Sequence, residues 1–161
     1  MRTKFTLLAL LLVLKPVTLF ANNFSTKQQQ IYGKWECSSE WENDVLIGSE
    51  SVSIDINEIS KFYDQSGKFE IRNKKAPEKS SILEYRAVLL YELENMNMIS
   101  TSDVFEVKHI KDELSIFGEE KIRSFKKKGL VSKSALNLIN PNRIISVTES
   151  GKTYECHRVH S

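Results

Sequence analysis

Residues 31–38 read IYGKWECS, and residues 153–160, near the other end of the chain, read TYECHRVH. In the first segment Trp35 and Cys37 alternate with charged residues, which is the period-two pattern of a half-buried β-strand. Each segment carries one of the two cysteines of the chain, Cys37 and Cys156. The sequence therefore predicts two strands, one at each end of the folded chain, with a cysteine on each.

The start of the chain has the residue order of a secretory signal peptide. Arg2 and Lys4 precede the apolar run FTLLALLLVL at residues 5–14, and Ala21 is the first small residue after that run. This order predicts a signal peptide over residues 1–21 with cleavage near Ala21, and hence a periplasmic or secreted protein. A run of about ten apolar residues is too short to cross a membrane as a helix, so we expect no transmembrane segment. An uncleaved anchor is the alternative.

Cleavage changes the charge balance. The whole chain has 23 basic and 21 acidic residues and a formal charge of +2. Three of the basic residues and none of the acidic residues lie in residues 1–21, so the mature chain has a formal charge of −1. This balance excludes the basic footprint of a nucleic-acid-binding protein. We expect a flexible polar arm over residues 22–30, followed by one domain over residues 31–161.

The two cysteines are expected to form a disulfide, because an even number of cysteines in an exported chain indicates pairing. Two independent buried thiols are the alternative. If Cys37 lies directly opposite Cys156 in an antiparallel pair, the same register places Trp35 opposite Arg158. A guanidinium over an indole ring contributes about 0.5–2 kcal/mol. The first and last strands would then close an up-and-down barrel.

The middle of the chain predicts further short strands separated by loops. Alternating or apolar segments that favour strands lie at residues 51–56, 59–63, 68–73, 98–110, 132–139 and 143–148. Turns or loops are expected at residues 39–47, 64–67 and 74–81. Residues 82–93 fit one face of a strand but also carry helix-favouring residues, so a long hairpin and a helix both remain open there.

These elements together predict a mainly β protein. Residues 112–129 have a helical apolar stripe and end in Lys126, Lys127 and Lys128 before Gly129, as helices often do. We therefore expect an antiparallel up-and-down barrel of about eight strands, with one helix near residues 112–129.

A resemblance supports this architecture. Gly-Lys-Trp at residues 33–35 resembles the Gly-x-Trp signature of lipocalin-like barrels. The pairing of Trp35-x-Cys37 near the start with Cys156-x-Arg158 at the end resembles small exported bacterial proteins with a lipocalin-like, or calycin-type, β-barrel domain. The resemblance implies a basic residue that packs across the tryptophan, here Arg158, a bacterial periplasmic location, and the binding of a small molecule.

No catalytic or cofactor motif is present. The sequence lacks a Gly-x-Ser-x-Gly elbow and a Gly-rich phosphate loop, so we expect no enzyme, metal or cofactor. If the barrel is hollow, its wall would hold a small apolar or amphipathic ligand, and a void above roughly 300 Å³ would favour this function. The residues expected to line such a cavity are Trp35, Leu83, Tyr85, Leu89 and Tyr91.

Two other functions remain open. A filled barrel would favour a periplasmic protein-binding inhibitor or immunity-type protein, with the exposed loops around Trp41 and at residues 74–81 as the contact surface. The same tryptophan could instead cover one end of the barrel. A purely structural component of the cell envelope is the third possibility. In each case we expect a monomer.

Overall fold

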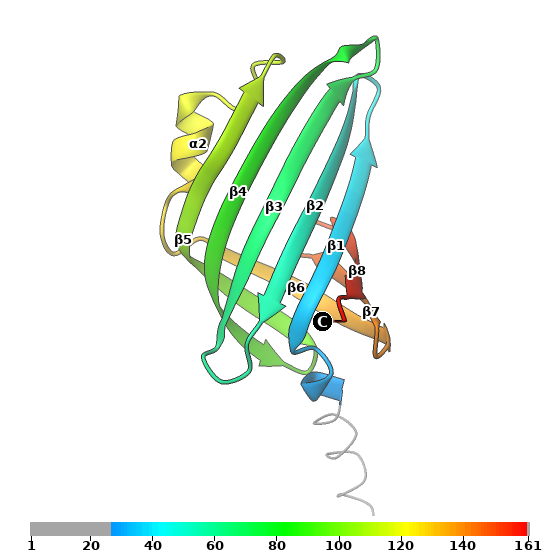
Figure 1. Cartoon of the computed structure of the whole chain (residues 1–161), viewed down its shortest axis with the longest axis vertical. Helices are drawn as coiled ribbons and strands as arrows, with labels where there is room; N and C mark the ends of the chain where they lie inside the picture. The colour runs from blue at the N-terminus through cyan, green and yellow to red at the C-terminus, as the bar shows by residue number, and fades with distance from the viewer. Residues whose placement is uncertain (1–26, 161) are drawn as a thin grey trace, which may run out of the picture.

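The computed structural model describes residues 27–160, in which eight strands form one closed antiparallel sheet in sequence order (Figure 1). The sheet closes because the last strand pairs with the first. The strands are β1 (Gly33–Glu42), β2 (Leu46–Ile56), β3 (Phe62–Asn73), β4 (Ala76–Glu94), β5 (Asn97–Asp112), β6 (Val131–Asn140), β7 (Arg143–Thr148) and β8 (Thr153–Arg158). The mainly β, up-and-down prediction is confirmed. The predicted signal peptide and its cleavage near Ala21 lie outside the described residues.

The sheet is closed over only part of its length, because β2–β5 are longer than β6–β8. Strand β8 pairs with β1 only between Trp35 and Ser38, and β6 pairs with β5 only between Asn97 and Thr101. In Figure 1, β6–β8 cross behind the lower part of the long strands. We call this the closed part. In the upper part, β1–β5 form an open curved sheet, and residues 113–130 pack on its inner face; we call this the covered part.

The closed part contains the larger core. Inward-facing residues alternate with exposed ones, as the period-two pattern predicts. A short helical turn at residues 27–29 leads into Ile31, which is fully buried at the lower end. The buried residues of this core are Ile31, Trp35, Cys37, Val52, Ile56, Tyr63, Tyr91, Met98, Ile144 and Cys156.

The covered part has a second, smaller core. Its buried residues are Ile71, Leu83 and Phe117, and the ring of Phe117 meets that of Phe69 edge-on with 6.1 Å between centroids. The helix α2 (Glu119–Phe125) lies beside the upper part of β5 and adds half-buried apolar side chains to this core (Figure 1). The covered part is therefore held together by side-chain packing where β6–β8 do not reach.

The predicted helix over residues 112–129 is too long, since α2 contains only Glu119–Phe125. Asp112 still belongs to β5. Its carboxylate accepts hydrogen bonds from the backbone N–H groups of Ile116 and Phe117, at 2.7 and 2.8 Å. These bonds fix a non-helical turn before α2. The apolar stripe that predicted one helix is therefore divided between this turn and α2.

The predicted turn at residues 64–67 is also wrong, because this segment lies inside β3 and pairs with both β2 and β4. Gly67 is needed there for space: a Cβ at this position would lie 2.5 Å from Cζ of Tyr85. The real turn precedes β3. The side chain of Asn57 accepts hydrogen bonds from two backbone N–H groups in it, at 2.9 and 3.0 Å.

The predicted loops at residues 39–47 and 74–81 are shorter than expected. The β1–β2 turn contains only residues 43–45, and the β3–β4 turn only residues 74–75. Trp41 consequently lies in β1 rather than in a loop. Residues 82–93 lie wholly within β4, so the strand prediction is confirmed and the helix alternative is wrong.

Candidate functional site

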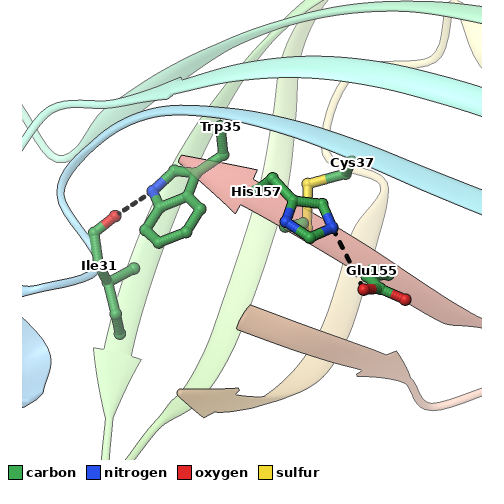
Figure 2. Close-up of a disulfide and its surroundings, with 6 residues drawn as sticks. Ile31, Trp35, Cys37, Glu155 and His157 are labelled. Carbon is green, nitrogen blue, oxygen red and sulfur yellow. Dashed lines mark hydrogen bonds and ion pairs between the residues drawn. A yellow bond between two sulfur atoms is a disulfide. The ribbon is translucent and has the colours of Figure 1, made fainter. Parts of the chain in front are cut away.

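The first and last strands are joined by the predicted disulfide between Cys37 and Cys156. These cysteines face each other in the β1–β8 ladder, and Trp35 faces Arg158 in the same register, as predicted. Figure 2 shows the indole of Trp35 and the disulfide on the same side of β1. His157 on β8 instead contacts the exposed side chain of Glu155, with 3.2 Å between Nε2 and Oε1. A disulfide is compatible with a location outside the cytoplasm.

Arg158 closes the lower end of the interior. Its guanidinium carbon lies 4.2 Å from the centroid of the Trp35 ring. Its Nε donates a hydrogen bond to the Pro141 carbonyl and its Nη1 to the Tyr32 carbonyl, both at 2.8 Å, and Nη2 donates to the carbonyl of Gln30. Burial lowers the pKa of Arg158 below the usual value of an arginine. One side chain therefore joins the last strand, the β6–β7 turn and the segment before β1.

The backbone at the start of β1 is shaped by this contact. Gly33 has a φ of +113°, and a Cβ there would lie 3.0 Å from Nη1 of Arg158. Trp35 donates its indole N–H to the carbonyl of Ile31 at 2.7 Å (Figure 2). Glycine at position 33 is therefore favoured by its positive φ and the close approach of Arg158, and Trp35 by its contacts with Ile31 and Arg158.

The closed part is hollow. It contains a cavity of about 300 Å³ whose wall is mostly apolar. Residues that line it include Trp35, Val52, Tyr63, Leu89, Met98 and Tyr154. The disulfide is part of the same wall, so the covalent link between β1 and β8 also encloses this space.

The covered part contains a second cavity, of about 370 Å³, with a wall rich in aromatic rings. Residues that line it include Phe69, Leu83, Tyr85, Phe105, Phe117 and Phe125. Gln65, Leu89 and Ser132 line both cavities. The two spaces therefore adjoin one another along the interior of the sheet.

The predicted lining residues divide between these spaces. Trp35 lines the cavity of the closed part, Leu83 and Tyr85 line that of the covered part, and Leu89 lines both. Tyr91 is buried elsewhere: its hydroxyl donates to the carbonyl of Asn57 at 2.8 Å, and burial raises its pKa to about 12. Four of the five predicted residues thus reach a cavity.

Trp41 occupies the inner face of β1 at the upper end. It is half-buried and packs against the core of the covered part. Its ring lies over Gly48, where a Cβ would be only 2.1 Å from Cε2 of the indole. This geometry is that of a tryptophan covering one end of the interior.

The interior also contains a polar cluster that the sequence reasoning missed. Glu50 on β2 is buried, and its carboxylate accepts hydrogen bonds from the hydroxyls of Tyr85 and Tyr154, at 2.7 and 2.6 Å. The ammonium group of Lys152 pairs with the same carboxylate. Gln65 donates its amide N–H to the hydroxyl of Tyr85 at 2.7 Å. We call Glu50, Gln65, Tyr85, Lys152 and Tyr154 the Glu50 cluster.

The Glu50 cluster lies where the two cavities adjoin. Glu50 and Tyr85 line the cavity of the covered part, Tyr154 lines that of the closed part, and Gln65 lines both. Burial, and then the nearby Glu50 carboxylate, raise the pKa values of Tyr85 and Tyr154 above the usual 10.0. Both hydroxyls therefore stay protonated and remain donors to Glu50.

A sequence signal for Glu50 did exist. The alternation of Val52, Ile54 and Ile56 predicted a half-buried strand, and extending it by one step toward the N-terminus places Glu50 on the buried face. A carboxylate on such a face requires donors, since burying an unpaired charge is costly. Its partner Lys152 lies about a hundred residues away in the sequence, so no local pattern could identify it.

Within residues 27–160, no helix has the length and apolar character needed to cross a membrane. In the same part of the chain, no three His, Cys, Asp or Glu side chains are grouped so that they could hold a metal ion. Compared with known proteins, the chain matches no family model and no curated protein sequence.

Proposed function

We propose that this chain is an exported, periplasmic, non-catalytic binding protein of the lipocalin-like type, which holds a small amphipathic ligand inside its closed sheet. The observation that carries the proposal is the pair of adjoining cavities, of about 300 and 370 Å³. Pockets for small molecules usually have volumes of roughly 300–1,000 Å³, mostly apolar walls and a few convergent polar groups. The Glu50 cluster supplies such polar groups.

The protein-binding alternative has less support. It requires a filled interior and an exposed tryptophan at the contact surface. Trp41 is half-buried against the core of the covered part, and its ring covers Gly48. The open interior and the position of Trp41 therefore favour the ligand-binding proposal.

The test is the binding of a neutral apolar fluorophore, N-phenyl-1-naphthylamine, to the purified mature protein. We expect saturable binding with enhanced emission, because the probe moves from water into an apolar cavity. In Ala87→Trp the new indole would fill part of the cavity of the covered part, which Ala87 lines. We expect binding to weaken by about tenfold, corresponding to about 1.4 kcal/mol.

The matched control is Leu90→Trp, which adds the same ring at an exposed position of the same strand. It should bind the probe as the unmodified protein does. Native mass spectrometry of material purified without detergent provides a second readout, in which a stoichiometric small molecule supports the proposal. Absence of saturable probe binding, or equal binding by Ala87→Trp and the unmodified protein, would overturn it.

A further inference from the structure

The Glu50 cluster contains one fixed charge and one movable charge. Glu50 lies in the middle of β2, where Ser39 on one side and Phe69 on the other are its partners in the sheet. Lys152 belongs to the turn between β7 and β8 and reaches the cluster from the surface. The Lys152 side chain is 25% exposed, compared with 10% for that of Glu50. The carboxylate is therefore a permanent part of the wall, whereas the ammonium group can be exchanged.

The surroundings of that ammonium group suit an organic cation. Nζ of Lys152 lies 5.0 Å from the centroid of the Phe69 ring and 4.8 Å from that of Tyr154. Aromatic faces within about 6 Å attract ammonium groups, most strongly where water is excluded. A carboxylate and two aromatic faces therefore converge on one cationic position.

An apolar space begins next to this position. Glu50 and Phe69 both line the cavity of the covered part, together with Phe105, Phe117 and Phe125. A ligand whose ammonium group replaced that of Lys152 could place an apolar tail among these rings. The exchange would conserve charge, since one ammonium group would leave the carboxylate as another arrived.

A ligand carboxylate has a less favourable position available. Lys121 lines the same cavity, but this residue is exposed, where water and salt screen its charge. Beside the Glu50 cluster, an added anion would face the buried Glu50 carboxylate at close range. The fixed charge of the wall thus selects for a cation.

Building on the proposed function, we propose that the ligand is an amphipathic organic cation. Its ammonium group pairs with Glu50 between the rings of Phe69 and Tyr154, and its apolar tail occupies the cavity of the covered part. Lys152 holds the ammonium position when the ligand is absent and moves into solvent when it binds. Rotation about the side-chain bonds of Lys152 is enough for this movement, because Lys152 belongs to a surface turn whose residues 149–151 are exposed.

The test compares three probes that share a ten-carbon tail: decylammonium, decanol and decanoate. Each displaces N-phenyl-1-naphthylamine from the mature protein at pH 7. We expect decylammonium to bind about tenfold more tightly than decanol, because its ammonium group replaces that of Lys152 in the cation–π and carboxylate contacts while the released Lys152 is hydrated by solvent. Decanoate should bind the most weakly of the three.

Three variants identify the groups responsible. Lys152→Met removes the internal competitor and should tighten decylammonium binding by about tenfold. Glu50→Gln should abolish the preference of the protein for decylammonium over decanol while leaving decanol binding in place. The control is Lys108→Met, which removes a surface cation paired with Glu106 outside both cavities, and it should preserve the ranking of the unmodified protein.

The outcomes separate this inference from the proposed function. If decanol and the fluorophore bind but decylammonium has no advantage, or decanoate binds best, the cation inference fails and the cavity function stands. If no probe binds, both fail. Should Lys152→Met not fold, the ranking of the three probes on the unmodified protein is decisive by itself.

Discussion

The closed part and the covered part enclose similar volumes by different means. In the closed part, backbone hydrogen bonds run around the whole sheet, and a disulfide and Arg158 lock the first strand to the last. In the covered part, β1–β5 form an open sheet, and residues 113–130 take the place of missing strands. The comparison shows that one sheet can combine a covalently closed end with an end held mainly by side-chain packing.

The covering segment is attached at two points. At its start, Asp112 and Ser81 hold the turn before α2: the Ser81 hydroxyl donates to Asp112 at 2.6 Å and accepts from Leu114 N–H at 3.0 Å. At its end, the backbone of Ser102 exchanges hydrogen bonds with Gly129 and Leu130. Because most of this segment lies outside the hydrogen-bonded sheet, we expect it to open at lower free energy than the strands.

The largest expected effect is the loss of the disulfide. Replacing both Cys37 and Cys156 by alanine should lower the free energy of unfolding by about 4 kcal/mol, because the disulfide closes a loop with a sequence separation of 119, and this loop gains freedom in the unfolded state. Denaturant unfolding of the oxidised protein and the variant measures the difference. Reduction of the unmodified protein should reproduce it. A loss below about 1 kcal/mol would show that the sheet closes without covalent help.

A smaller and more local effect is expected from Asp112→Ala. This change removes the hydrogen bonds from Ser81, Ile116 and Phe117 and should cost about 2 kcal/mol. Amide hydrogen exchange should accelerate over residues 113–130 and stay unchanged in β1 and β8. The control is Asp64→Ala on an exposed ion pair with Arg86, which should cost less than about 1 kcal/mol. Uniform acceleration across the chain would contradict the division into two parts.

The closed part could be predicted because the residue spacings in its first and last strands agree with one another. The spacing of two residues between Trp35 and Cys37 equals that between Cys156 and Arg158. One assumed pairing therefore fixed the register, and the structure confirms it. Of the residues predicted to line a cavity, Trp35 and Leu89 line the cavity of this part.

The covered part could not be predicted in the same way, because its structure depends on distant partners. The Asp-Gln-Ser-Gly segment at residues 64–67 has the composition of a turn, but pairing on both sides and the Tyr85 ring over Gly67 keep it extended. The helical stripe after Asp112 is interrupted by a carboxylate that accepts backbone hydrogen bonds. Glu50 and Lys152 meet only after the sheet has closed.

The smallest expected effect is a response of the covered part to acid. Burial acts to raise the pKa of Asp112, but the hydrogen bonds from Ser81, Ile116 and Phe117 outweigh it and leave the pKa below the usual 3.8. Because the folded-state pKa is the lower one, the stabilisation is complete above the unfolded-state value and is lost as the pH falls through the folded-state value. The covered part should therefore loosen below about pH 4.

The two tryptophans of the chain report on the two parts separately, since Trp35 lies in the closed core and Trp41 packs on the covered core. With Trp35→Phe, the remaining emission from Trp41 should shift to longer wavelength between about pH 4 and pH 2. With Trp41→Phe, the emission from Trp35 should stay constant over this range, because the groups that contact its ring, Arg158 and the Ile31 carbonyl, do not titrate there. Adding Asp112→Asn to the first variant should abolish its transition. A simultaneous shift of both tryptophans would mean that acid unfolds the protein as one unit.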